Sequence, residues 1–136
     1  MNRSMLREQL IRHEGRRKKP YVDTVGKVSI GVGRNLTDRG LSPAEIDYLF
    51  ENDIDSCIAD LDNNLPWWRE LSDARQHVLL DMCFNMGIKR LLKFVNTLAD
   101  VQAGRYNDAA DNMLKSKWAG QVGQRAKTLA RMMRDG

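Results

Sequence analysis

Apolar residues recur at helical spacing over the first 14 residues of the chain. Leu6 and Leu10 lie four positions apart, and Glu14 continues the same series. Side chains four apart lie on one face of a helix, so the pattern predicts a helix over residues 4–14, with Gly15 ending it. On such an apolar face we expect the Glu14 carboxyl to lose water, which raises the pKa of an acid.

The pattern then changes to that of β-strands. We expect a short strand at residues 21–23, a turn at 24–27 that contains Gly26, and a second strand over 28–33. In the second strand valine and isoleucine alternate with Ser29 and two glycines. The alternation predicts an aliphatic face that packs inward, and an open face on which the glycines let a ligand approach the backbone.

A long helix is predicted to begin at Ser42, with this residue as N-cap, Pro43 at the first helical position and Glu45 at the third. Its apolar positions continue almost to Pro66, so we assign residues 42–64 to it. Two tryptophans follow directly. We favour packing at a helix junction for them over a platform for sugars.

The second half of the chain shows helical spacing only. Glycines at 87, 104 and 120 are expected to end three of its helices, and a fourth closes the chain. The fold class is therefore α+β and mostly α, with a short antiparallel sheet near the N-terminus. We expect one domain over residues 1–136: a small β-containing lobe at 15–41, the connecting helix at 42–64, and a helical lobe at 65–136 that includes helix 4–14.

Composition is that of an ordinary globular protein, with 42% hydrophobic and 29% charged residues among 136. We expect no membrane span and no export signal, because no apolar run of the needed length occurs. Cys57 and Cys83 occupy apolar helical positions and are expected to be buried free thiols. Their spacing with two scattered histidines suggests neither a metal site nor another cofactor.

The net charge of +4 favours a polyanionic partner, such as nucleic acid, anionic lipid or acidic cell wall. Part of this charge lies in the basic run at residues 16–19, which we expect to be a solvated loop. Attraction of an anionic substrate and simple solubility explain this run equally well.

Two carboxylates are candidates for chemistry. Glu14 is predicted at the end of a helix and Asp23 at the end of a strand, so they lie in different surroundings, as an acid and a base must. Each has an ordinary alternative: Glu14 could face solvent, and Asp23 could simply flank a turn.

Several collinear motifs give the chain a resemblance to a known family. They are Glu14-Gly15, Tyr21-x-Asp23, Ser29-Ile30-Gly31-Val32-Gly33, Phe84-Asn85-Met86-Gly87, Phe94-x-Asn96-Thr97-Leu98, Lys115-Ser116-Lys117-Trp118 and Arg125-Ala126-Lys127. In this order they resemble the phage-type lysozymes, the endolysins of glycoside hydrolase family 24, over nearly the whole chain. The resemblance implies a lysozyme-like fold with a substrate cleft between its lobes.

The resemblance also implies roles for individual residues. The family's Glu-x8-Asp-x5-Thr pattern stands here as Glu14, Asp23 and Ser29, with serine keeping the hydroxyl of threonine. Phe84, Asn85, Thr97 and Asn112 fall where the family lines its sugar-binding cleft. Arg125 falls where the family places an arginine beside the catalytic glutamate.

Two departures from the family concern the small lobe. The residue after the last strand glycine is often histidine in the family, and here it is Arg34. The connection that leads to Ser42 is also short, so we expect a trimmed rim around the sheet. Substrate contacts from that rim do not carry over to this chain.

The activity that the resemblance implies is hydrolysis of the β-1,4 bond between N-acetylmuramic acid and N-acetylglucosamine in peptidoglycan, with inversion. It further implies a monomer made in the host cytoplasm, which reaches the wall after the membrane is permeabilised and neither binds nucleic acid nor inserts stably into membranes. Two alternatives stay open: a basic helical nucleic-acid-binding module, and a wall-binding protein with weak catalysis.

Overall fold

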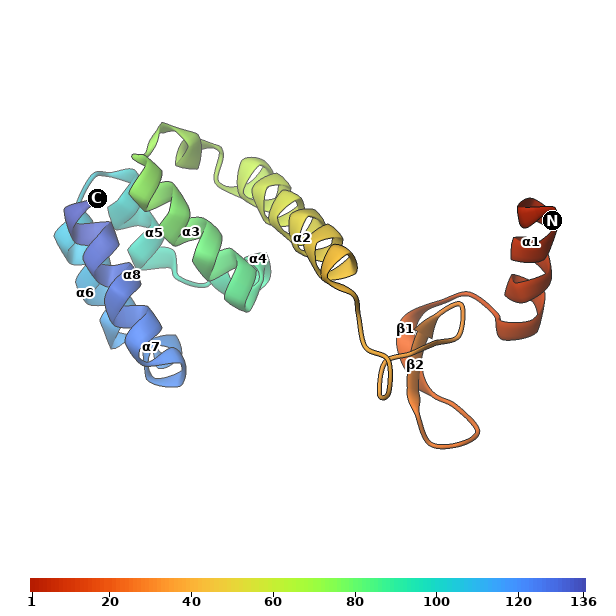
Figure 1. Cartoon of the computed structure of the whole chain (residues 1–136). Helices are drawn as coiled ribbons and strands as arrows, with labels where there is room; N and C mark the ends of the chain where they lie inside the picture. The colour runs from red at the N-terminus through yellow and green to blue at the C-terminus, as the bar shows by residue number, and fades with distance from the viewer. The chain divides into compact units, whose positions relative to one another are not determined.

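The computed structural model describes residues 1–136, which form two compact units, Met1–Tyr48 and Leu49–Gly136 (Figure 1). The first unit holds one helix, a small sheet and the start of a long helix. The second unit consists of the remainder of that helix and further helices only. The predicted class, mostly helical with one small antiparallel sheet near the N-terminus, is confirmed.

Helix α1, Arg3–Glu14, opens the first unit. The side chain of Asn2 caps it by accepting a hydrogen bond from the Met5 N–H at 3.1 Å. Gly15, at φ 80°, ends it and donates its N–H to the Ile11 carbonyl at 2.8 Å. The predicted helix and its glycine stop are therefore confirmed.

The expected apolar surroundings of Glu14 are not observed. Helix α1 has no buried residue, and Glu14 itself is exposed. Spacing by four residues identifies which side chains share a helix face, but it does not identify an element that covers the face. The prediction that burial removes water from the Glu14 carboxyl is wrong in this structure.

Strands β1 (Arg17–Val22), β2 (Val28–Gly31) and β3 (Arg34–Asn35) form an antiparallel sheet in the order β1-β2-β3. The turn between the first two contains Gly26 at φ 83°, as predicted. Two expectations were wrong. The basic run at 16–19, expected to be a loop, enters the first strand. The second strand, expected over 28–33, ends at Gly31, and a third short strand follows at Arg34–Asn35. Exposed, charged residues begin the first strand, and half-buried Arg34 and Asn35 form the third, so no hydrophobic alternation marks either place.

The sheet buries the opposite face from the one predicted. Ser29 is 3% exposed, whereas Val28 and Val32 are 38% and 41% exposed. Ser29 lies on the central strand, directly opposite Tyr21 on one side and Asn35 on the other. Directly opposed residues share a face, so the larger neighbours enclose the small serine side chain.

Helix α2, Pro43–Asn64, begins in the first unit with the predicted capping pattern. Glu45 Oε1 accepts the Ser42 N–H at 2.8 Å, and Ser42 Oγ accepts the Glu45 N–H at 3.2 Å. Glu45 also receives a two-pronged contact from Arg34, with Nη1–Oε1 2.7 Å and Nη2–Oε2 2.6 Å. The ion pair joins strand β3 to the start of α2.

The second unit is a helical bundle. After α2 come η1 (Pro66–Glu70), α3 (Asp73–Met86), α4 (Ile88–Leu91), α5 (Val95–Gln102), α6 (Tyr106–Lys115), α7 (Lys117–Val122) and α8 (Gln124–Asp135). Leu61, Val78, Leu91, Val101, Met113 and Met133 are fully buried in its core. No helix in the chain is both long and apolar enough to cross a bilayer.

Several predictions for this unit are confirmed, and one is wrong. Trp68 packs in the core at 3% exposure and donates its indole N–H to Asp62 at 2.7 Å. Cys57 and Cys83 are buried free thiols, and burial raises the pKa of Cys83 to about 12. Gly120 does not end a helix. The helix is interrupted four residues earlier, at Ser116, which caps α7 by accepting the Ala119 N–H at 3.1 Å, and Gly120 lies within α7.

We expect Glu45→Gln to lower the melting temperature near pH 7 and to have little effect near pH 2. Hydrogen bonds from Arg34 and then from Ser42 lower the pKa of Glu45 from 4.5 to about 2. A lowered pKa stabilises the folded state above about pH 4.5, and this stabilisation is lost as the pH falls towards 2. Thermal unfolding across this range tests it, with Glu51→Gln on the exposed surface of α2 as control. A pH-independent difference would contradict the assignment.

Candidate functional site

The eight residues predicted to act at a site divide between the two units. Glu14, Asp23 and Ser29 lie in the first, and Phe84, Asn85, Thr97, Asn112 and Arg125 lie in the second. Each set is described within its own unit.

Glu14 is the last residue of α1, and its side chain reaches the turn between β2 and β3. A Cβ atom at Gly33 would lie 2.8 Å from Glu14 Oε2 and 3.0 Å from its carboxyl carbon. Gly33 also has φ +65°, which other residues rarely adopt. The carboxyl thus rests against bare backbone, and a side chain at position 33 would displace it.

Asp23 is tied to the turn that follows β1. Its Oδ1 accepts the N–H groups of Val25 at 3.0 Å and Lys27 at 2.9 Å, and its own N–H donates to the Lys27 carbonyl at 2.8 Å. Oδ2 takes no part in either side-chain bond. Asp23 therefore stabilises the turn, as expected for an aspartate that simply flanks a turn. Its second carboxylate oxygen, Oδ2, is left to bind another partner.

Ser29 and Asp23 share one face of the sheet. Tyr21 opposes Ser29 directly, and the backbone bond from Asp23 to Lys27 continues the same ladder two residues further on. Because side chains alternate along a strand, Asp23 lies on the same side as Tyr21 and Ser29. The fold therefore gathers a carboxylate and a hydroxyl on one surface of this small unit.

In the second unit, Trp118 orients Asn85. The buried indole N–H of Trp118 donates to Asn85 Oδ1 at 2.8 Å, so the amide N–H groups of Asn85 are left for other partners. The Trp118 ring also contacts Phe94 edge to face, with centroids 6.1 Å apart. Phe84 is 42% exposed and contacts Phe50 in the same manner.

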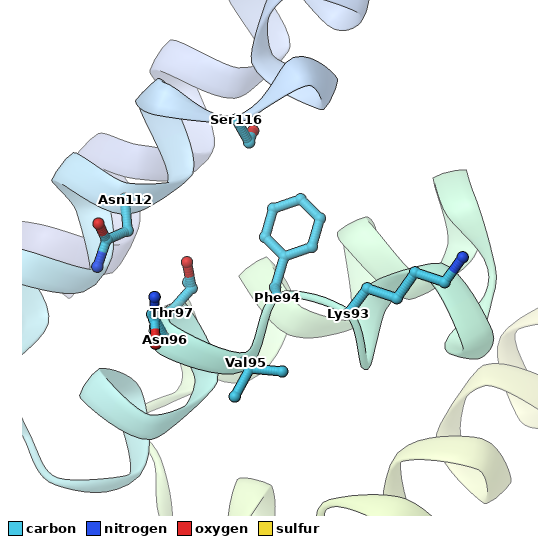
Figure 2. Close-up of a pocket in the computed structure, with 7 residues that line it drawn as sticks. All are labelled: Lys93, Phe94, Val95, Asn96, Thr97, Asn112 and Ser116. Carbon is cyan, nitrogen blue, oxygen red and sulfur yellow. The ribbon is translucent and has the colours of Figure 1, made fainter.

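Thr97 and Asn112 line one hollow of about 310 Å³, with Asn96, Ser116 and Phe94 beside them (Figure 2). Asp100 holds the Asn112 amide by accepting from Nδ2 at 2.8 Å, and it also accepts from Arg105 at 2.9 Å. This leaves the Asn112 carbonyl oxygen as an acceptor. The sequence did not single out Asp100, because its contact with Asn112 depends on how α5 and α6 pack together.

Arg125 has a partner within its own unit. Its guanidinium binds Asp81, with Nε–Oδ1 2.8 Å and Nη2–Oδ1 2.6 Å. Both residues line a largely apolar hollow of about 350 Å³ together with Phe50, Ile54, His77, Leu80 and Phe84. The Asp81 contact was not predicted, and a role for Arg125 beside Glu14 stays a prediction. The structure holds no group of three metal-ligating side chains.

We expect Asp23→Asn to keep the stability of the fold and Asp23→Ala to lower it by about 1–3 kcal/mol, because two hydrogen bonds to Oδ1 are removed. The asparagine carbonyl oxygen can accept the same two N–H groups as the carboxylate. Urea unfolding of both variants gives the comparison. Equal losses for the two variants would mean that the charge of Asp23, and not its acceptor geometry, stabilises the turn.

Comparisons with known proteins identify the family of the chain. A family model described as phage lysozyme matches residues 11–134. Probable T4-type lysozymes 1 and 2 of Dictyostelium discoideum are 22% and 24% identical over 162 aligned positions, covering 98% of this chain and 95% of each relative. The pre-baseplate central spike protein Gp5 of Enterobacteria phage T4 is 29% identical over 95% of this chain and 27% of its own length. The chain belongs to the phage lysozyme family.

Proposed function

We propose that the protein is a muramidase, which hydrolyses the β-1,4 bond between N-acetylmuramic acid and N-acetylglucosamine in peptidoglycan. Membership of the phage lysozyme family implies a glycoside hydrolase that acts on this polymer. The observation that carries the proposal is the placement of Glu14, Asp23 and Ser29 in one compact unit, with their family spacing intact.

Glu14 is the proposed general acid. It donates its proton to the glycosidic oxygen as the bond from that oxygen to the anomeric carbon breaks. Its contact with Gly33 supports this role, because a carboxyl held against backbone keeps one position relative to the sheet. An acid in this position typically contributes a factor of ~10²–10⁴ to the rate.

Asp23 is the proposed general base, in its ionised form. A water molecule attacks the anomeric carbon from the face opposite the leaving oxygen and passes its proton to Asp23. The two N–H groups on Oδ1 support this assignment, because they hold the carboxylate still and leave Oδ2 for the water. Ser29, on the same face, is proposed to orient that water through its hydroxyl. Inversion requires carboxyl groups ~6.5–9.5 Å apart, with the water between them.

The residues of the second unit are proposed to bind the glycan. Phe84 offers an exposed aromatic ring, and Asn85 offers amide N–H groups that Trp118 has oriented. Thr97 and Asn112 supply a hydroxyl and a carbonyl oxygen in one hollow. Such neutral donors and acceptors match the acetamido and hydroxyl groups of amino sugars. Arg125 is proposed to stabilise the acid end of the site by its charge.

The biological role that we propose is release of phage progeny, by an enzyme that acts as a monomer on the wall once the membrane has been opened. The similarity to part of a phage spike protein shows that related sequence also occurs within a much longer chain. A nucleic-acid-binding module, the competing interpretation of the net charge, would not need the acid pair.

We expect Glu14→Gln to lower the rate of wall hydrolysis by about 10²–10⁴-fold, since the amide cannot donate the proton. Asp23→Asn should be nearly as damaging, and Ser29→Ala should cost less than either. Release of reducing ends from purified peptidoglycan measures the rates, and a zymogram separates a hydrolase from both a nucleic-acid-binding module and an inactive wall binder. Full activity in Glu14→Gln would refute the acid role.

Two glycine variants separate the Glu14 contact from backbone strain. Gly33 and Gly26 both have positive φ, at +65° and +83°, but only a Cβ at position 33 meets another residue, Glu14. We expect each alanine to destabilise the fold by about 1–2 kcal/mol through its φ. Only Gly33→Ala should reduce the hydrolysis rate of the folded enzyme at least ~10-fold, because it moves the acid. Equal rates in both variants would contradict the proposed role of this contact.

A further inference from the structure

The net charge of the chain lies entirely in its first unit. Met1–Tyr48 contains ten basic and six acidic residues, whereas Leu49–Gly136 contains twelve of each. The excess of +4 therefore belongs to the unit that holds the small sheet. The four consecutive cations of the basic run at 16–19 alone equal that excess.

The basic run lies along a free edge of the sheet. Strand β1 pairs only with β2, so its other edge has no neighbouring strand. All four cations are exposed, and none of them takes part in an ion pair. The chain also has no acidic residue from Gly15 to Val22. Like charges this close repel one another, and an anionic ligand relieves that repulsion.

Protection of the sheet edge does not explain the whole run. A charged edge strand prevents the strands of two molecules from pairing, and a lysine or a proline on the edge serves that purpose. Strand β1 already contains Pro20, which has no N–H to donate to an added strand. Solubility alone does not require that the charge be gathered in one unit and cancelled in the other.

Exposed aliphatic side chains lie at the end of the same strand. Val22 is the last residue of β1 and is 69% exposed, and Val25, in the turn that follows, is 75% exposed. Turns ordinarily carry glycine, proline, asparagine, aspartate or serine, so an exposed valine in this turn is unusual. Val22 lies directly opposite Val28, which is 38% exposed, and the two share one face of the sheet. Cations and aliphatic side chains thus follow one another along β1 and its turn.

We propose that β1 and the turn after it bind the surface of an anionic lipid bilayer. The cations at 16–19 pair with lipid phosphates, while Val22 and Val25 enter the boundary between the headgroups and the acyl chains. The inference goes beyond the proposed hydrolysis, because it concerns the surface at which the enzyme is held and not the reaction.

An anionic bilayer fits these groups better than a soluble polyanion does. Peptidoglycan and phosphate-bearing polymers are hydrophilic and offer no apolar layer to Val22 and Val25. Single-stranded nucleic acid binds by stacking its bases on aromatic rings. Tyr21 has the only aromatic ring of β1, and the Arg17 guanidinium already lies over that ring, 4.6 Å from its centroid. A bilayer supplies both the phosphates and the apolar layer.

Flotation of the full chain with lipid vesicles tests the inference. Vesicles of phosphatidylcholine alone are compared with vesicles of equal parts phosphatidylcholine and phosphatidylglycerol. We expect binding to the anionic vesicles only, and weaker binding as salt is added. We expect Arg16→Gln/Lys18→Gln/Lys19→Gln to weaken this binding on the order of 10²-fold, since each cation near such a surface contributes about a factor of five. Arg17 is kept because it contacts Tyr21.

Two further variants control for net charge and for folding. Lys89→Gln/Lys127→Gln/Arg131→Gln removes one arginine and two lysines from exposed positions of the second unit. We expect its binding to change less than about twofold, because those charges lie outside the proposed surface. A variant that exchanges arginine and lysine at the three tested positions keeps every charge and should bind as the wild type does. Thermal unfolding confirms that each variant is folded.

Three results would overturn the proposed surface. The first is a wild type that does not bind anionic vesicles, and the second is equal weakening by the two glutamine variants. The third is loss of binding in the variant that keeps every charge, because the vesicles would then recognise something other than charge.

A last variant separates the bilayer from soluble polyanions. Val22→Thr/Val25→Thr keeps the β-branched shape and removes the apolar character. We expect it to weaken vesicle binding about fivefold and to leave binding of soluble polyphosphate unchanged. Unchanged vesicle binding would contradict the assignment to lipid.

The glutamine variant of the basic run is also compared on polyphosphate, on single-stranded DNA and on purified peptidoglycan, with Glu14→Gln added to prevent cleavage. A larger loss of affinity for any of these polymers than for anionic vesicles would assign the run to that polymer and overturn the assignment to lipid. No vesicle measurement involves cleavage, so this inference and the proposed hydrolysis can fail separately.

Discussion

The attachment of Asp23 to its own turn is the interaction on which the arrangement of the small unit depends. One carboxylate oxygen accepts two backbone N–H groups, and the backbone of the same residue pairs with Lys27. These bonds fix the end of β1 against β2, and thereby fix the register that sets Ser29 opposite Tyr21. A residue that would otherwise be a mobile surface acid is thus held on the face that carries the serine hydroxyl.

A structural contact also positions a candidate functional group at Glu14 and in the second unit. Glu14 ends a helix that has no buried residue, and its carboxyl rests on the bare backbone of Gly33. Trp118 fills the core with its ring, its N–H orients Asn85 at the surface, and its ring contacts Phe94 edge to face. In each place a residue with a structural contact also positions a group that the proposed chemistry uses.

The sequence predicted the elements whose local signals are strong. The capping pattern at Ser42 and the glycines at 15 and 26 each act within a few residues, and all were found where expected. The buried face of the sheet was predicted wrongly because it depends on which strands lie on either side of Ser29. Alternation along one strand cannot supply that information. The interruption of the helix at Ser116 was missed because apolar residues continue at helical spacing across it. In the structure Ser116 caps a new helix, α7.

The candidate residues were predicted from spacing, whereas their partners were not. The ion pair between Arg34 and Glu45 and the Asp81 contact of Arg125 each join residues that are separate in sequence. Pairwise contacts of this kind depend on the fold, so sequence patterns identify one member and not the other.

The configuration of the first product tests the central claim most directly, namely that a fixed Asp23 activates water while Glu14 supplies a proton. Proton NMR of a soluble peptidoglycan oligomer during the first minutes of cleavage distinguishes the two anomers before they equilibrate. A base that acts through water inverts the anomeric carbon, so the account predicts that the α-anomer accumulates first. Initial release of the β-anomer would contradict it, because that outcome requires retention and a different role for Asp23.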